Sequence, residues 1–191
     1  MKPPRISSDG VPRVRLWVEV YLTRSDAETA LTDAVQGAVP PPATVAGIVA
    51  LLREYLAGAA RTGAEYGGNV YNATDRHREW AGDAIERLWP AVWKTVREFD
   101  DDVPRIVVRV RIDLTRTEVE TALTDAMQTT DAPPATPAEA ERLLRAYLAS
   151  IARLGAEFGG NVYNATDRDR DHAEAAAALL WPAEVAEAVG P

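Results

Sequence analysis

The chain has 191 residues, of which 47% are hydrophobic, and it carries a formal net charge of −8. It contains no cysteine, which excludes disulfides, thiolate zinc sites and cysteine nucleophiles. The acidic balance argues against a nucleic-acid partner, because binding to a phosphate backbone depends on many lysine and arginine contacts. No apolar run approaches the roughly 18 residues of a membrane span, and the first ten residues lack the apolar stretch of a signal peptide. We therefore expect a cytoplasmic protein without membrane contact, from a bacterium with a GC-rich genome, which explains the abundant arginine and alanine.

A ten-residue stretch occurs twice. Residues 67–76 read GGNVYNATDR, and residues 159–168, 92 positions later, read the same. This offset relates about 48 identical residues among the 82 positions from 11 to 92, without a gap. The pattern predicts a tandem duplication with three parts: an N-terminal tail (1–10), a first repeat (11–102) and a second repeat (103–191).

Each repeat begins with the alternating pattern of a half-buried strand, over residues 12–24 and 104–116. The inward positions are apolar in both: Leu16, Val18, Val20 and Leu22 in the first, and Val108, Val110, Ile112 and Leu114 in the second. The outward face carries Trp17 and Tyr21 in the first repeat and different residues in the second. We expect the apolar face to pack on helices.

The next segment of each repeat predicts a helix that begins at a capping box. We assign the boxes to Ser25 with Glu28 and to Thr117 with Glu120. The inward face of this helix is apolar in both repeats: Ala27, Ala30, Leu31, Ala34 and Val35, then Val119, Ala122, Leu123, Ala126 and Met127. Prolines at 40–42 and at 133–134 end it.

Two further helices follow in each repeat. The long second helix has predicted N-caps at Thr44 and Thr136 and predicted ends at Gly67 and Gly159. The third helix begins at Thr74 or Asp75, and at Thr166 or Asp167, and its predicted ends are marked by Pro90 and Pro182.

One strand per repeat would leave unpaired backbone groups along both of its edges. We therefore predict an α+β fold, a tandem duplication of a strand-helix-helix-helix unit, whose two strands pair in one small sheet with the helices on one face. A pseudo-twofold axis would relate the two units, and the direction of the strands stays open. The other face of the sheet, with Trp17 and Tyr21, is then a surface for a protein partner or for self-association.

The repeated loop is the first candidate for a binding site, because it combines donors, acceptors, an aromatic ring and both charges. Its candidate residues are Asn69, Tyr71, Asn72, Asp75 and Arg76, with Asn161, Tyr163, Asn164, Asp167 and Arg168 in the second repeat. Amides at the start of the following helix attract anions, and Arg76 or Arg168 can hold a carboxylate or a phosphate. The same residues also suit a purely structural corner between helices, so both interpretations stay open.

We expect no cofactor and no metal. The acids at 167, 169 and 171 resemble the opening of a calcium loop, but the glycine and the final glutamate of that loop are missing. His77 and His172 do not align between the repeats, so they do not form a paired metal site. The sequence also lacks the motifs of serine hydrolases, zinc peptidases and dinucleotide-binding folds, and any catalysis would depend on Tyr, Asp and Arg alone.

These observations favour a non-enzymatic protein-binding or adaptor module. The alternative is a protein that binds a small molecule or anion, or an enzyme, with equivalent sites at the two loops. There the tyrosines of the loops would donate, the aspartates would act as base, and the arginines would hold negative charge. An open pocket lined by Tyr71 and Arg76 would favour this alternative. A third interpretation treats the acidic surface as a nucleic-acid mimic that blocks a DNA-binding protein.

Overall fold

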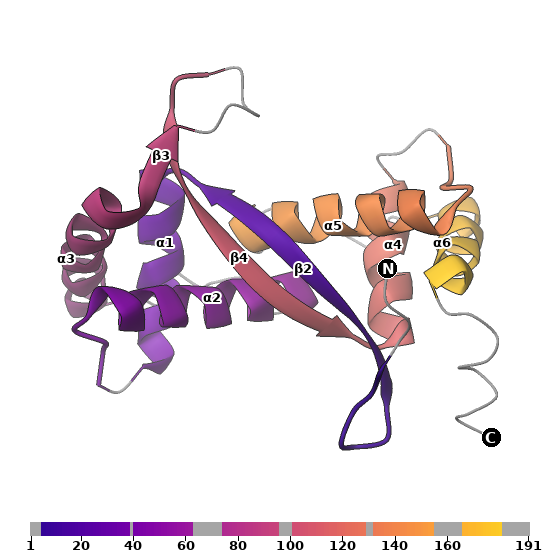
Figure 1. Cartoon of the computed structure of the whole chain (residues 1–191), viewed down its shortest axis with the longest axis horizontal. Helices are drawn as coiled ribbons and strands as arrows, with labels where there is room; N and C mark the ends of the chain where they lie inside the picture. The colour runs from indigo at the N-terminus through magenta and orange to yellow at the C-terminus, as the bar shows by residue number, and fades with distance from the viewer. Residues whose placement is uncertain are drawn as a thin grey trace.

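The computed structural model describes residues 5–38, 40–62, 74–95, 101–128, 132–154 and 166–180, without the side chains of 5, 6, 62, 92–95 and 154. Within these residues it has four strands and six α-helices (Figure 1). In chain order they are β1 (Arg5–Ile6), β2 (Pro12–Leu22), α1 (Arg24–Ala34), α2 (Val45–Thr62), α3 (Asp75–Val92), β3 (Trp93–Thr95), β4 (Pro104–Leu114), α4 (Arg116–Met127), α5 (Pro137–Leu154) and α6 (Asp167–Leu180). A short 3₁₀ turn, η1 (Val35–Gly37), follows α1. The α+β class is confirmed.

The centre of the fold is an antiparallel pair of long strands. β2 and β4 are each 11 residues long and pair from Val14 with Leu114 to Leu22 with Ile106. The sheet has the order β1-β2-β4-β3, in which β1 pairs only with the first two residues of β2, and β3 with the first three of β4. The predicted pairing of the segments 12–24 and 104–116 is confirmed, although each strand ends two residues earlier than predicted, and the direction that the sequence left open is antiparallel.

The two faces of this strand pair have opposite environments. From Val14 in β2 and from Ile106 in β4, every second side chain is buried, and these are the apolar ones: Val14, Leu16, Val18, Val20 and Leu22 of β2, and Ile106, Val108, Val110, Ile112 and Leu114 of β4. The side chains between them on β2 are exposed at Arg15, Trp17 and Glu19. Figure 1 shows α2 and α5 behind the sheet, and none of the described helices crosses its front. Helices therefore cover the apolar face and leave the polar face open.

Each long helix packs on the strand of the other half of the chain. α5 contacts β2, α2 contacts β4, and the two helices also contact each other. α1 and α3 pack together at one end of the molecule, and α4 and α6 at the other (Figure 1). One hydrophobic cluster includes Leu52 and Leu56 from α2 together with Leu144 and Leu148 from α5. The two halves therefore share a single core.

The first helix of each half begins two residues earlier than the sequence predicts. The capping boxes assigned to Ser25 with Glu28 and to Thr117 with Glu120 are wrong. The boxes are formed instead by Thr23 with Asp26 and by Thr115 with Glu118. A hydroxyl followed three residues later by an acid occurs twice in succession in each stretch, and the helix uses the earlier pair because the strand ends at the residue just before it.

The other predicted helix boundaries have mixed outcomes. The Thr44 hydroxyl accepts from the Gly47 amide at 3.1 Å, and the Thr136 hydroxyl accepts from the Glu139 amide at 3.3 Å, which confirms both as N-caps. Pro90 does not end the third helix, because α3 continues to Val92. A proline in the last turn removes only one helical hydrogen bond, so the helix can continue past it briefly. The predicted ends at 67, 159 and 182 lie outside the described residues.

Since the halves share one core, we expect the chain to unfold in a single cooperative transition. Leu148→Ala in α5 removes a buried side chain and should lower the free energy of unfolding by about 2 to 5 kcal/mol. Four of the five tryptophans precede residue 103, so tryptophan fluorescence reports mainly the first half, while far-UV circular dichroism reports the whole chain. The urea midpoints from both signals should fall together.

The exposed Arg142 of the same helix provides the control, because Arg142→Ala should leave both midpoints unchanged. A fluorescence midpoint that stays at the wild-type value in Leu148→Ala, while the dichroism midpoint falls, would mean that the halves unfold independently.

Candidate functional site

The structure describes the repeated loop only where it enters α3 and α6. Six of the predicted loop residues lie outside the described residues: Asn69, Tyr71, Asn72, Asn161, Tyr163 and Asn164. The other four occupy the first two positions of the helices and are exposed: Asp75, Arg76, Asp167 and Arg168. Asp75 lies 3.8 Å from Arg78, and Asp167 lies 3.1 Å from Arg170, so each carboxylate has a partner in its own helix.

The two helices differ at their third residue. In α6 the Asp169 carboxylate accepts from the Thr166 amide at 2.8 Å and from its hydroxyl at 2.6 Å, and these bonds lower the pKa of Asp169. In α3 the corresponding residue is His77, whose Nδ1 accepts from the Thr74 amide at 3.2 Å. An imidazole that accepts through Nδ1 has its proton on Nε2 when it is neutral, so that nitrogen remains a donor.

A pocket of about 540 Å³ lies beside the start of α3. One wall follows α1 and consists of Val35, Gln36, Ala38 and the run 40–43. The other wall belongs to α3 and consists of Arg76, His77, Trp80 and Arg87. The structure thus places one predicted loop residue, Arg76, at the edge of a pocket whose size is typical of small-molecule sites.

Several contacts hold the two walls in position. Arg87 donates to the carbonyl oxygens of Asp83 at 3.1 Å and of Ala43 at 3.0 Å, so it joins α3 to the proline-rich wall. A Cβ atom on Gly47 would lie 2.8 Å from the Pro42 ring, which means that Pro42 packs directly on the first turn of α2. Trp80 packs against the hydrophobic core. The pocket is therefore built on secondary structure that the core supports.

The open face of β2 and β4 is the second candidate site. Trp17 exposes 44% of its surface there, and the Arg109 guanidinium lies 5.0 Å from its ring centroid, within the range of a cation–π contact. Arg15 pairs with Asp113 at 2.6 Å, and the half-buried Tyr21 donates to Glu19 at 3.1 Å. The face therefore combines exposed aromatic surface with ordered charges.

The backbone beneath Trp17 is held from the helix side. Arg145 of α5 donates to the carbonyl oxygen of Trp17, and it also pairs with Glu141 at 2.5 Å. This contact satisfies a backbone acceptor of β2 and links the strand to the long helix of the other half. Trp17 thus lies on a firmly supported backbone.

Two partly buried acid–tyrosine pairs are features that the sequence analysis missed. Tyr55 of α2 donates to Asp33 of α1 at 3.0 Å, and Tyr147 of α5 donates to Asp125 of α4 at 2.8 Å. Burial raises the pKa of both aspartates, and the tyrosine bonds partly offset the effect. The signal in the sequence is the run ETALTDA, identical at 28–34 and 120–126, which puts an acid among the apolar letters of a helix.

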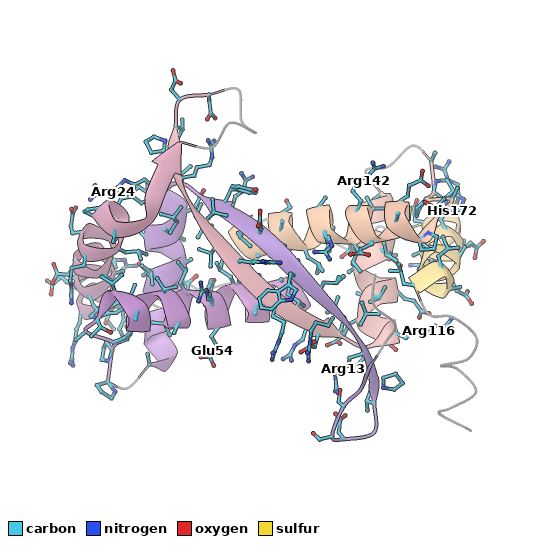
Figure 2. All side chains as sticks on the ribbon, viewed as in Figure 1. Arg13, Arg24, Glu54, Arg116, Arg142 and His172 are labelled. Carbon is cyan, nitrogen blue, oxygen red and sulfur yellow. The ribbon has the colours of Figure 1, made fainter. Side chains whose placement is uncertain are left out.

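Charged pairs also stabilise the start of each long strand. Asp9 accepts from Arg13 at 2.9 Å and from the Val11 amide at 3.1 Å, which lowers the pKa of Asp9 to about 2. Asp101 and Arg105 form the same pair at the start of β4, at 2.7 Å. Figure 2 shows Arg13 at the lower end of the strand pair. These pairs secure the strand ends, and we assign them no ligand.

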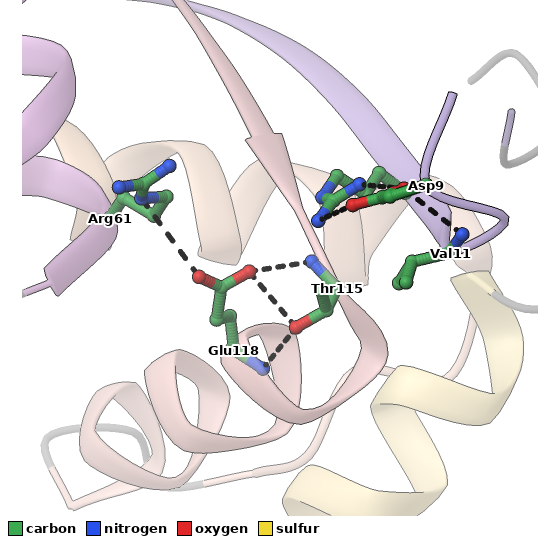
Figure 3. Close-up of polar contacts among 6 residues, drawn as sticks. Asp9, Val11, Arg61, Thr115 and Glu118 are labelled. Carbon is green, nitrogen blue, oxygen red and sulfur yellow. Dashed lines mark hydrogen bonds and ion pairs between the residues drawn. The ribbon is translucent and has the colours of Figure 1, made fainter. Parts of the chain in front are cut away.

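One further charged contact connects the halves. Glu118, the capping acid of α4, accepts from the Thr115 amide at 2.7 Å and lies 3.9 Å from Arg61 of α2 (Figure 3). Its carboxylate is thereby occupied by structural partners. The ion pair thus links the last turn of α2 to the first turn of α4.

Comparisons with protein-family models, with curated proteins and with solved structures give no match for this chain. Among the residues that the structure describes, no group of His, Asp and Glu side chains is arranged to hold a metal ion. None of the described helices is both long and apolar enough to cross a membrane. The function therefore has to be argued from the pocket and the open sheet face.

The tyrosine–aspartate pairs predict a pH-dependent loss of stability. Because the pKa of each aspartate is higher in the folded than in the unfolded chain, its contribution to the free energy of unfolding is largest below the unfolded pKa. This contribution is lost as pH rises through the folded pKa. Tyr147→Phe removes a donor from a buried carboxylate, so it should cost about 1 to 3 kcal/mol at pH 7. The loss should shrink as pH falls and Asp125 becomes protonated. Urea unfolding at several pH values measures this trend.

Tyr21→Phe serves as the control, since Tyr21 bonds to an exposed carboxylate and should change stability by less than about 0.5 kcal/mol. A loss in Tyr147→Phe that is the same at acid and neutral pH would show that the hydroxyl does not act through the ionised aspartate.

Proposed function

We propose that this protein is a non-enzymatic protein-binding module, and that the open face of β2 and β4 takes an acidic segment of a partner protein. The observation that carries the proposal is the solvent-exposed Trp17, stacked by Arg109 on a sheet face that none of the described helices covers. Tryptophan, tyrosine and arginine dominate the binding energy of protein interfaces, and this face holds all three.

Charge supports an acidic partner. The outward side chains of the strand pair include three arginines, Arg15, Arg109 and Arg111, against two acids, Glu19 and Asp113. The whole chain has a net charge of −8, so a face with excess positive charge is unusual for this molecule. A partner with acidic groups is attracted to it, whereas a second copy of the chain is repelled by the overall charge.

We also propose that the module arose by tandem duplication and has a pseudo-twofold axis normal to the sheet. The register supports this, because Val18 pairs with Val110, the residue 92 positions later. On either side, Leu16 pairs with Ile112 and Val20 with Val108, as a twofold through the central pair requires. The lengths of the long helices support it too, since α2 and α5 each have 18 residues.

The proposed axis also accounts for the exposed pair. Trp17 and Arg109 are 92 positions apart, so they occupy equivalent sites close to the axis. Two arginines there would repel each other, whereas tryptophan and arginine attract through the cation–π contact. This face is thus asymmetric although the fold beneath it repeats, which favours one partner in one orientation.

The proposal is tested with Trp17→Ser. Partners captured from the source cells by the wild-type protein are purified, and their affinity is measured by calorimetry. Trp17→Ser should raise Kd at least about tenfold, as expected for a central aromatic contact. The wild-type affinity should also fall as salt rises, because the partner is acidic.

Val103 is an exposed apolar residue that lies outside the two strands, so Val103→Ser is the matched control and should leave Kd unchanged. A captured partner that binds Trp17→Ser as tightly as wild type contradicts the proposal. So does a mass in light scattering that doubles for wild type and not for Trp17→Ser, because the face would then bind a second copy.

A further inference from the structure

We infer that the pocket between η1 and α3 binds a small carboxylate that carries an aromatic ring. None of the described residues that line this pocket belongs to a strand, so the site is separate from the sheet face and does not depend on the function proposed for it. Its volume of about 540 Å³ accommodates one ligand of this size.

The charge of the lining identifies an anion as the ligand. Among the described residues that line the pocket, Arg76 and Arg87 are cationic and none is an aspartate or glutamate, although the chain has 29 acidic and 21 basic residues. Arg87 is already bonded to the carbonyls of Asp83 and Ala43. Among the described residues, no hydrogen bond or ion pair engages the Arg76 guanidinium, which is therefore available to a carboxylate.

His77 adds a second donor to this cationic wall. Its Nδ1 is occupied by the Thr74 amide, so the neutral ring presents its proton on Nε2. His77 lines the pocket next to Arg76, and an anion held by the guanidinium can accept from this second donor. One carboxylate matches this small donor set, while a polyphosphate would need more cations or a glycine-rich loop.

The remaining walls favour a flat ring. Trp80 and the prolines at 40–42 line the pocket, and they offer apolar surface on which an aromatic ring can stack. Packing of Pro42 on the first turn of α2 keeps the proline wall in place. A ligand with a ring at one end and a carboxylate at the other satisfies both parts of the lining.

The second half of the chain provides a natural control. The residues 92 positions after His77, Trp80 and Arg87 are an aspartate, a histidine and a leucine: Asp169, His172 and Leu179. Asp169 caps α6 with an ionised carboxylate, which would repel an anion. Arg168 corresponds to Arg76 in sequence and is exposed at the same helical position, but its helix has no equivalent of His77, Trp80 and Arg87.

The test uses 1-naphthoate as the probe and isothermal titration calorimetry on the full chain. We expect saturable binding to one site, with a Kd at least tenfold lower than for uncharged 1-naphthylmethanol. Arg76→Gln should raise the Kd for 1-naphthoate at least tenfold, and Arg168→Gln should change it by less than twofold. Both arginines are exposed at the start of their helices, and thermal unfolding of each variant verifies that the fold is kept.

Three results would overturn the inference. One is the lack of saturable heat with 1-naphthoate at millimolar concentration. Another is an Arg76→Gln variant that binds as tightly as wild type. The third is an equal loss in Arg76→Gln and Arg168→Gln, because the binding would then not belong to the pocket in the first half.

Discussion

β2 and β4 pair over nine residues, whereas β1 and β3 contribute two and three pairs at the outer edges. Without β4, the strand β2 would have only its two-residue partner, and so few hydrogen bonds do not maintain a strand in water. The helices also make each half depend on the other, since α5 packs on β2 and α2 packs on β4. The core and the strand pair are therefore joint products of both halves of the chain.

This arrangement also explains why one sheet face stays open. α2 and α5 fill the buried side, and the other described helices pack at the two ends of the molecule (Figure 1). No further amphipathic helix among the described residues is left to cover the front, so its side chains have to tolerate water. Charged pairs such as Arg15 with Asp113 do so readily. Trp17 tolerates water less well, and a partner that buries its ring would gain the corresponding hydrophobic free energy.

Local patterns in the sequence were sufficient to predict the strands and helices, but not the tertiary contacts between them. Alternation identified β2 and β4, and hydroxyl N-caps identified the starts of α2 and α5. The capping boxes were misplaced by two residues because the same spacing occurs twice, and only the end of the strand selects between them. The pocket was hidden because its walls are some 40 residues apart in the chain, around 35–43 and 76–87. The bond between Asp33 and Tyr55 was hidden for the same reason, since local periodicity carries no information on tertiary contacts.

In the proposed duplication, the two faces of the strand pair diverged to different extents. The equivalent inward pairs remain apolar: Val14 and Ile106, Leu16 and Val108, Val18 and Val110, Val20 and Ile112, Leu22 and Leu114. The outward pairs all differ: Arg15 and Val107, Trp17 and Arg109, Glu19 and Arg111, Tyr21 and Asp113. Close packing constrains the inward residues, because a change of even one methylene in a core affects stability.

The outward residues face solvent and are free to vary, yet they form specific contacts across the strands, between Arg15 and Asp113 and between Trp17 and Arg109. Variation without selection would not favour such matched contacts, and this argues that the outer face is constrained as one asymmetric surface.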